Sequence, residues 1–229
     1  MVITVKKLFS FLMVIFLMIG VCGCTMKNQD KIDAMVSYIN DKYTDDSFEF
    51  VKISGGHIGS NTTKIIVSSQ KYPNKEIRVI CSEVNGEKFY SDTYLNYKFE
   101  DQTYNFIKNT LVKEYGENVY LKYIPDDIGS IKNGSSGTTF EEYISNSYNC
   151  IYFSAAVVYS GESKDELLTI IKSAFADSVI SAHIYFVDTE ELLSDNATKF
   201  IDNKKYSECL YIVKDSVNEY VTIEWVEKV

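Results

Sequence analysis

The strongest constraint on the fold is a pattern that occurs three times along the chain: an apolar stripe with helical period, a short turn, then a run with strand character. The stripes contain Ile32, Met35, Val36, Ile39 and Tyr43; Tyr104, Ile107, Leu111 and Tyr115; and Leu167, Leu168, Ile171, Ala174 and Phe175. The runs that follow them are 48–53, 119–124 and 179–187. Ser163 and Glu166 have the spacing of a capping box, which predicts the start of the third helix.

Further strands are predicted between and after these units. They cover 64–69, 76–83, 88–95, 209–214 and 220–226. Asn85-Gly86 between two such runs is a strong hairpin signal, and 189–202 has the pattern of another helix. This mixture predicts an α+β fold with helices packed on a mainly antiparallel sheet, arranged either as two small α/β sandwich subdomains or as one continuous sheet.

A glycine- and serine-rich stretch at 126–139 is the weakest-patterned part of the chain. It predicts either a linker or one long surface loop. As a linker it separates a first α+β subdomain at 31–125 from a second at 140–229.

The first residues have the parts of an export signal. Lys6 and Lys7 are followed by an almost unbroken apolar run, Leu8 to Val21, which is shorter than the ~20 residues that a membrane-spanning helix needs. After Cys24 the chain becomes polar at once. Two other interpretations of this segment are an uncleaved membrane-spanning segment and a signal peptide removed by ordinary secretory cleavage.

The segment Val21-Cys22-Gly23-Cys24 resembles the cleavage site of bacterial lipoproteins, of a kind common in Gram-positive cells. The resemblance implies a signal peptide at 1–23, an acylated Cys24, and a short linker at 24–30. The segment departs from the usual lipoprotein pattern at Cys22, a position where Ser or Ala is more usual. The implied location is the extracytoplasmic face of the cell membrane, with the lipid bilayer as the first partner.

Charge excludes several classes of function. Without 1–23 the chain loses Lys6 and Lys7 and keeps 21 basic against 32 acidic residues, a net charge of −11. This balance argues against nucleic acid as a partner. Arg78 is the only arginine, so an arginine cluster for phosphate or carboxylate is excluded.

With two histidines and no Cys-x-x-Cys, neither a metal site nor a cofactor is predicted.

Three cysteines follow Cys24 and lie in strand-like runs: Cys81, Cys150 and Cys209. One disulfide with one free thiol is one interpretation, since the compartment would permit it. The favoured alternative is that all three are small buried apolar residues.

A glycine-rich loop, 55–61, carries the best local candidates for chemistry. His57 has the functional groups of a general base, and Ser60 those of a nucleophile. No nucleophile elbow or phosphate loop surrounds them, and a turn that needs positive φ explains the glycines equally. The other histidine, His183, is predicted to lie half-exposed in a strand, on one face with Ser181 and Tyr185.

Aromatic residues concentrate at 89–104. Tyr90, Tyr94, Tyr97 and Tyr104 form a candidate interaction surface, because tyrosine offers a large flat contact area with a polar tip. The alternative is that alternate side chains divide between core and solvent.

The sequence therefore favours a non-enzymatic binding or interaction module that is anchored to the membrane, with a surface protein or wall polymer as its partner. The alternative is a cell-wall-directed hydrolase that uses His57. A solute-binding role ranks third, because such proteins are generally larger and hinged.

Overall fold

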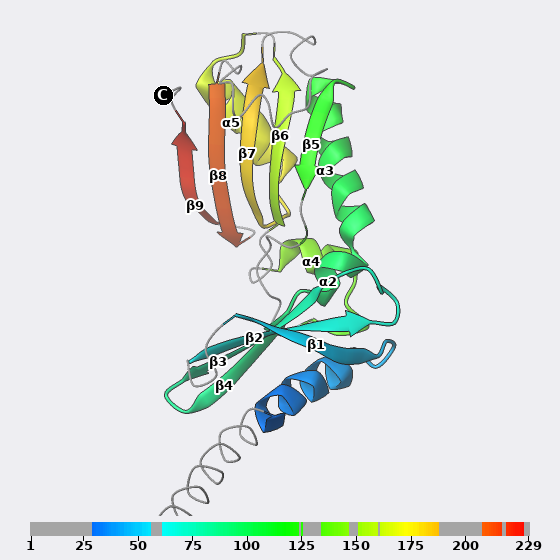
Figure 1. Cartoon of the computed structure of the whole chain (residues 1–229). Coiled ribbons are helices and arrows are strands. Elements are labelled where there is room, and N and C mark those ends of the chain that lie inside the picture. Colours follow the sequence, from blue (N-terminus) through cyan, green and yellow to red (C-terminus); the bar gives the residue numbers. More distant parts are fainter. Residues whose placement is uncertain are drawn as a thin grey trace, which may run out of the picture. The chain divides into compact units, whose positions relative to one another are not determined.

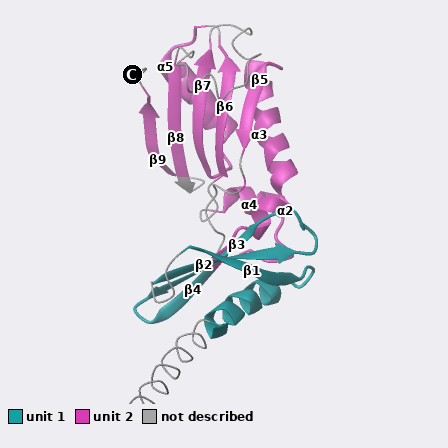
Figure 2. Cartoon of the chain, in the orientation of Figure 1, with its two compact units in different colours: residues 1–90 teal, residues 91–229 magenta. Residues whose placement is uncertain are grey.

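The computed structural model of the chain describes residues 29–55, 61–123, 125, 134–146, 151–159, 161–187, 208–216 and 219–226. The chain divides into two compact units, residues 1–90 and 91–229 (Figure 2). Each unit packs helices on a sheet, and all strand pairs but one are antiparallel among the described strands. The α+β prediction is confirmed.

Unit 1 consists of a helix, whose described residues are 29–42, and a four-stranded sheet in the order β1-β2-β3-β4 (Figure 1). The strands are β1 Phe48–Gly55, β2 Thr62–Ser69, β3 Ile77–Val84 and β4 Glu87–Asp92. Asn85 and Gly86 have φ values of 54° and 84° and form a tight turn between β3 and β4, as the sequence predicts.

The helix 29–42 buries the predicted stripe against one face of this sheet. Fully or nearly fully buried residues are Ile32, Met35, Ile39 and Tyr43 on the helix side, and Ile65, Val67, Ile77, Val79 and Cys81 in the strands. Asn40 fixes the last turn of the helix to the start of β1. Its Nδ2 donates to the Phe48 carbonyl at 3.1 Å, and its Oδ1 accepts from the Phe48 N–H at 3.0 Å.

The strand predicted at 88–95 ends earlier than expected. The chain leaves β4 after Asp92 and forms α2, Tyr94–Lys98. The buried Asp92 carboxylate accepts a hydrogen bond from the Tyr94 N–H at 3.0 Å. An Asp side chain that binds the backbone two residues on forms an Asx turn, which here ends the strand and starts the helix.

Unit 2 contains a five-stranded sheet in the order β5-β6-β7-β8-β9. Its elements after α2 are α3 Glu100–Tyr115, β5 Val119–Tyr123, α4 Phe140–Ser145, β6 Ile151–Val158, α5 Lys164–Ala174, β7 Ile180–Val187, β8 Glu208–Ser216 and β9 Glu219–Trp225. β6 and β7 are parallel because α5 connects them as a crossover.

Helices α3 and α5 share one core with one face of this sheet. The core joins Ile107, Leu121, Phe153, Ile171 and Ile184, together with their buried neighbours. Elements before and after 126–139 therefore share one core. The boundary between the two units, after residue 90, comes earlier in the sequence than that stretch. The predicted helix at 189–202 lies outside the described residues.

The ends of α5 are both capped. Ser163 and Glu166 form the predicted capping box. At the other end the Lys214 ammonium donates to the carbonyls of Phe175, at 3.0 Å, and Ala176. Lys214 is 1% exposed, so β8 buries a charge where the helix dipole favours it.

Candidate functional site

Several predicted residues fall outside the described part of the chain: Cys24, His57, Ser60 and Cys150. The described cysteines, Cys81 and Cys209, are buried free thiols, in agreement with the favoured interpretation. Burial raises the pKa of the Cys209 thiol to about 12, which leaves little of it as the reactive thiolate at neutral pH.

Two of the four tyrosines predicted to form an interaction surface are buried, so the four do not form it together. Tyr94 and Tyr97 are 1% and 5% exposed, because α2 turns both into the interior. Tyr90 stacks on Tyr38 of helix 29–42, with ring centroids 5.1 Å apart. Tyr104 is 41% exposed, and Thr103 takes its expected place in the buried stripe of α3. The prediction that these four tyrosines form one interaction surface is therefore corrected.

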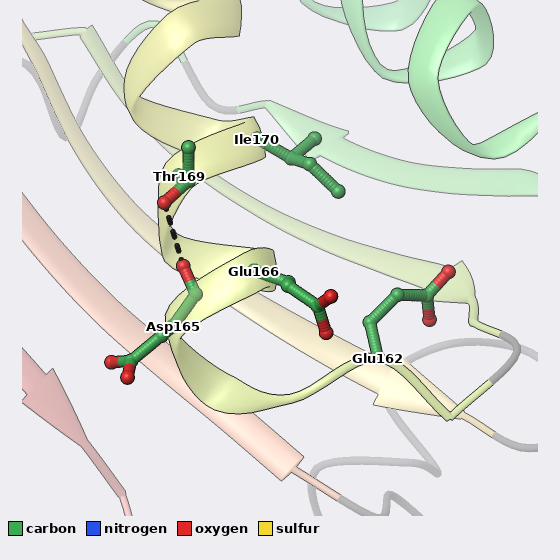
Figure 3. Close-up of a pocket in the computed structure, with 5 residues that line it drawn as sticks. All are labelled: Glu162, Asp165, Glu166, Thr169 and Ile170. Atoms are coloured by element: carbon green, nitrogen blue, oxygen red, sulfur yellow. Dashed lines mark hydrogen bonds between the residues drawn. The ribbon is translucent and has the colours of Figure 1, made fainter.

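Two open pockets lie among the described residues, and neither gathers reactive groups. The first, of about 390 Å³, is lined by Glu162, Asp165, Glu166, Thr169 and Ile170 (Figure 3). Asp165 points away from the two glutamates in Figure 3. Backbone and side-chain hydrogen bonds from Ser163 lower the pKa of Glu166, so this carboxylate caps α5. The described residues contain no cluster of three or more His, Cys, Asp or Glu that could hold a metal ion.

The second pocket, of about 340 Å³, lies in unit 1 and is lined by Ser47, Glu49, Ser68, Ser69, Gln70 and Pro73. Beside it the Asp46 carboxylate accepts from the N–H groups of Ser47 at 2.8 Å and Lys71 at 3.1 Å, and from the Ser69 hydroxyl. These bonds hold two turns together. Their role is structural.

The strongest concentration of functional groups lies on the face of the five-stranded sheet opposite the α3–α5 core. Successive side chains of a strand point to opposite faces. Because Phe153, Ile184 and Ile212 face the helices, their neighbours face the other way. We call these half-buried side chains the aromatic face: Tyr120, Tyr152, His183, Tyr185 and Tyr211.

The register of the strands places these rings side by side. His183 lies opposite Ser154 of β6 and Tyr211 of β8. The ring centroids of His183 and Tyr211 are 4.5 Å apart, with 19° between the planes. Tyr185 is parallel to His183 within 16°, at 6.4 Å. The Tyr152 ring meets His183 edge-on, with its hydroxyl 3.5 Å from Nδ1.

Burial lowers the pKa of His183 and so favours the neutral imidazole. A neutral imidazole has one donor and one acceptor nitrogen. No hydrogen bond joins the side chains of His183 and Ser154 in the described structure. The arrangement suits recognition through tyrosine hydroxyls, imidazole nitrogens and ring edges.

No protein-family model matches the sequence, and no curated protein matches it. Among solved structures the chain is similar to a DUF5037 family protein from Ruminococcus gnavus, with 14% identity over 82% of this chain and 93% of that chain. The TM-score is 0.33. None of the described helices is long and apolar enough to span a membrane.

The sequence indicated only part of the aromatic face. The prediction that His183 lies half-exposed beside Ser181 and Tyr185 is confirmed. Tyr152 and Tyr211 were not singled out. Their strand alternation could have placed each on a face, but the register that brings them to His183 is set by long-range pairing.

Proposed function

We propose that the chain is a lipid-anchored extracytoplasmic protein whose second unit binds a partner through the aromatic face. The observation that carries the proposal is the gathering of four tyrosines and a half-buried histidine on the sheet face opposite the helices. The proposed anchor is the acylated Cys24. A surface protein or a wall polymer is the expected partner.

The physical basis is that tyrosine combines area with hydrogen-bonding capacity, and is enriched at protein interfaces. Rings that stack on one another, as His183 and Tyr211 do, are already held in one orientation. Less side-chain entropy is then lost on binding. The hydrolase alternative stays a prediction, because His57 lies outside the described residues.

The anchor is tested by growing cells with a labelled fatty acid. The wild-type chain should carry the label, and Cys24→Ala should lose it. Cys22→Ser or Cys22→Ala is the matched control, and either variant should keep the label. Labelling that persists in Cys24→Ala would refute the anchor.

The binding face is tested by photo-crosslinking on cells. Lys122 and Glu224 are exposed and lie on the same side of the sheet as the aromatic face. Lys122 pairs with Ser154, and Glu224 pairs with Tyr211. A photoreactive residue at either position should capture a partner. The same residue at Lys113, whose side chain is 82% exposed on α3, is the control and should not.

A double substitution then tests the tyrosines themselves. Tyr152→Ser with Tyr211→Ser should abolish capture from position 122. Tyr104→Ser removes an exposed tyrosine from α3 and should leave capture unchanged. Capture that survives the double substitution, or that occurs equally from position 113, contradicts the proposed face.

A further inference from the structure

One end of the unit 1 sheet exposes large apolar side chains. Ile53, Val84 and Phe89 are 39%, 55% and 42% exposed. Ile53 pairs with Ile65 near the end of β1, and Thr62 at the start of β2 pairs with Ser82 near the end of β3. The tight turn at 85–86 joins β3 to β4 at the same place. We call Ile53, Val84 and Phe89 the apolar end of unit 1.

The first described turn of helix 29–42 lies toward this same end. Asn40, near the end of the helix, is hydrogen-bonded to Phe48 at the opposite end of β1. From Asn40 the helix runs back under the sheet (Figure 1), past Tyr38, which stacks on Tyr90 of β4. At about 1.5 Å per residue, residue 29 lies roughly 16 Å back along the helix axis from Asn40.

Only residues 25–28 separate Cys24 from residue 29. A fully extended chain spans about 3.4 Å per residue, so residue 29 lies within roughly 17 Å of the anchored cysteine. From this reach we propose that the apolar end of unit 1 meets edge-on the lipid surface to which Cys24 is attached, so that Ile53 on the helix-covered face and Val84 and Phe89 on the other face reach the interfacial layer. The inference rests on the proposed lipid anchor.

Charge supports this orientation. Residues 24–90 contain nine acidic and nine basic residues, a net charge of zero. Residues 91–229 contain 23 acidic and 12 basic residues, a net charge of −11. Anionic lipid repels the second unit and leaves the first unaffected. Near the apolar end the exposed charges are mixed, with Glu83 and Glu87 beside Lys88. The proposed contact with lipid therefore depends on apolar side chains rather than on charge, and high salt should not weaken it.

The experiment places a fluorescent label at Val84→Cys in the full lipidated chain, reconstituted in phosphatidylcholine vesicles with a minor fraction of phosphatidylglycerol. A lipid-borne quencher is carried at headgroup depth. The control is Asn74→Cys, an exposed position in the turn between β2 and β3, at the opposite end of the same sheet. Labelling of the wild-type chain gives the background from its own cysteines, of which Cys81 and Cys209 are buried.

Quenching at position 84 should be roughly twofold or more above that at position 74, and it should be unchanged in high salt. Adding Phe89→Glu should reduce it, because a carboxylate is driven out of the interfacial layer. Equal quenching at the two positions, or loss of the difference in salt, overturns the inference. A chain that fails to float with the vesicles refutes the anchor itself, and the inference falls with it.

Discussion

The buried charge of Lys214 gives the sharpest test of how unit 2 is held together. Lys214→Met keeps most of the side-chain stem and removes the ammonium that binds the carbonyls of Phe175 and Ala176. A hydrogen bond with a charged donor contributes about 1.5–3 kcal/mol. Removing a buried charge also relieves its desolvation, which offsets part of the loss. The free energy of unfolding should fall by about 2 kcal/mol.

The assay uses Trp225, the only tryptophan, which lies in β9 with its ring 6.0 Å from that of Phe186. Its fluorescence reports the unfolding of unit 2, and the thermal midpoint should fall by about 5 °C. The control is Lys113→Met, which removes an exposed ammonium from α3 and should change stability by less than ~0.5 kcal/mol. A loss no larger than the control would refute the reasoning.

The same pair of chains gives a pH test. Burial lowers the pKa of the Lys214 ammonium below its ordinary 10.5, while Asp177 acts in the opposite direction. The unfolded chain then binds this proton more tightly than the folded chain. Wild-type stability relative to Lys214→Met should therefore rise as pH increases toward 10.5. A fall over that range would mean that the carbonyls hold the proton more tightly than burial expels it.

Three further outcomes are expected. Alkylation of Cys209 at pH 8 should be far slower in the folded than in the denatured chain, because burial raises its thiol pKa to about 12; equal rates would contradict this burial. Ser163→Ala should lower the stability of unit 2 by about 1 kcal/mol, measured through Trp225, because the capping box of α5 is lost. Asp46→Ala should speed hydrogen exchange at the Lys71 amide, which loses its acceptor, and an unchanged exchange rate would count against the turn network.

Local signals predicted the elements that depend on neighbouring residues. The capping box at Ser163 and the turn at Asn85-Gly86 both occur where their spacing indicated. The buried stripe of helix 29–42 was also readable, since its period places Ile32, Met35 and Ile39 on one side. These features need no knowledge of distant partners.

The predictions that failed depend on contacts that the local pattern does not contain. The alternation at 88–95 fits a strand, but the Asp92 carboxylate bonds to the Tyr94 N–H and ends it. Tyr94 and Tyr97 consequently point into the interior. The aromatic face depends on the pairing of β6, β7 and β8, whose register brings Tyr211 to His183. A single sequence does not determine that register.

The order of strands in unit 1 has a consequence for biogenesis. β1, β2, β3 and β4 are neighbours in the sheet in the order in which they occur in the chain, so every pairing closes a short loop and forms rapidly. In unit 2 the first strand pair, β5 with β6, already spans α4, and β7 reaches β6 through α5. A chain is synthesised from its N-terminus. We therefore expect the sheet of unit 1 to be complete while the strands of the second sheet are still being made.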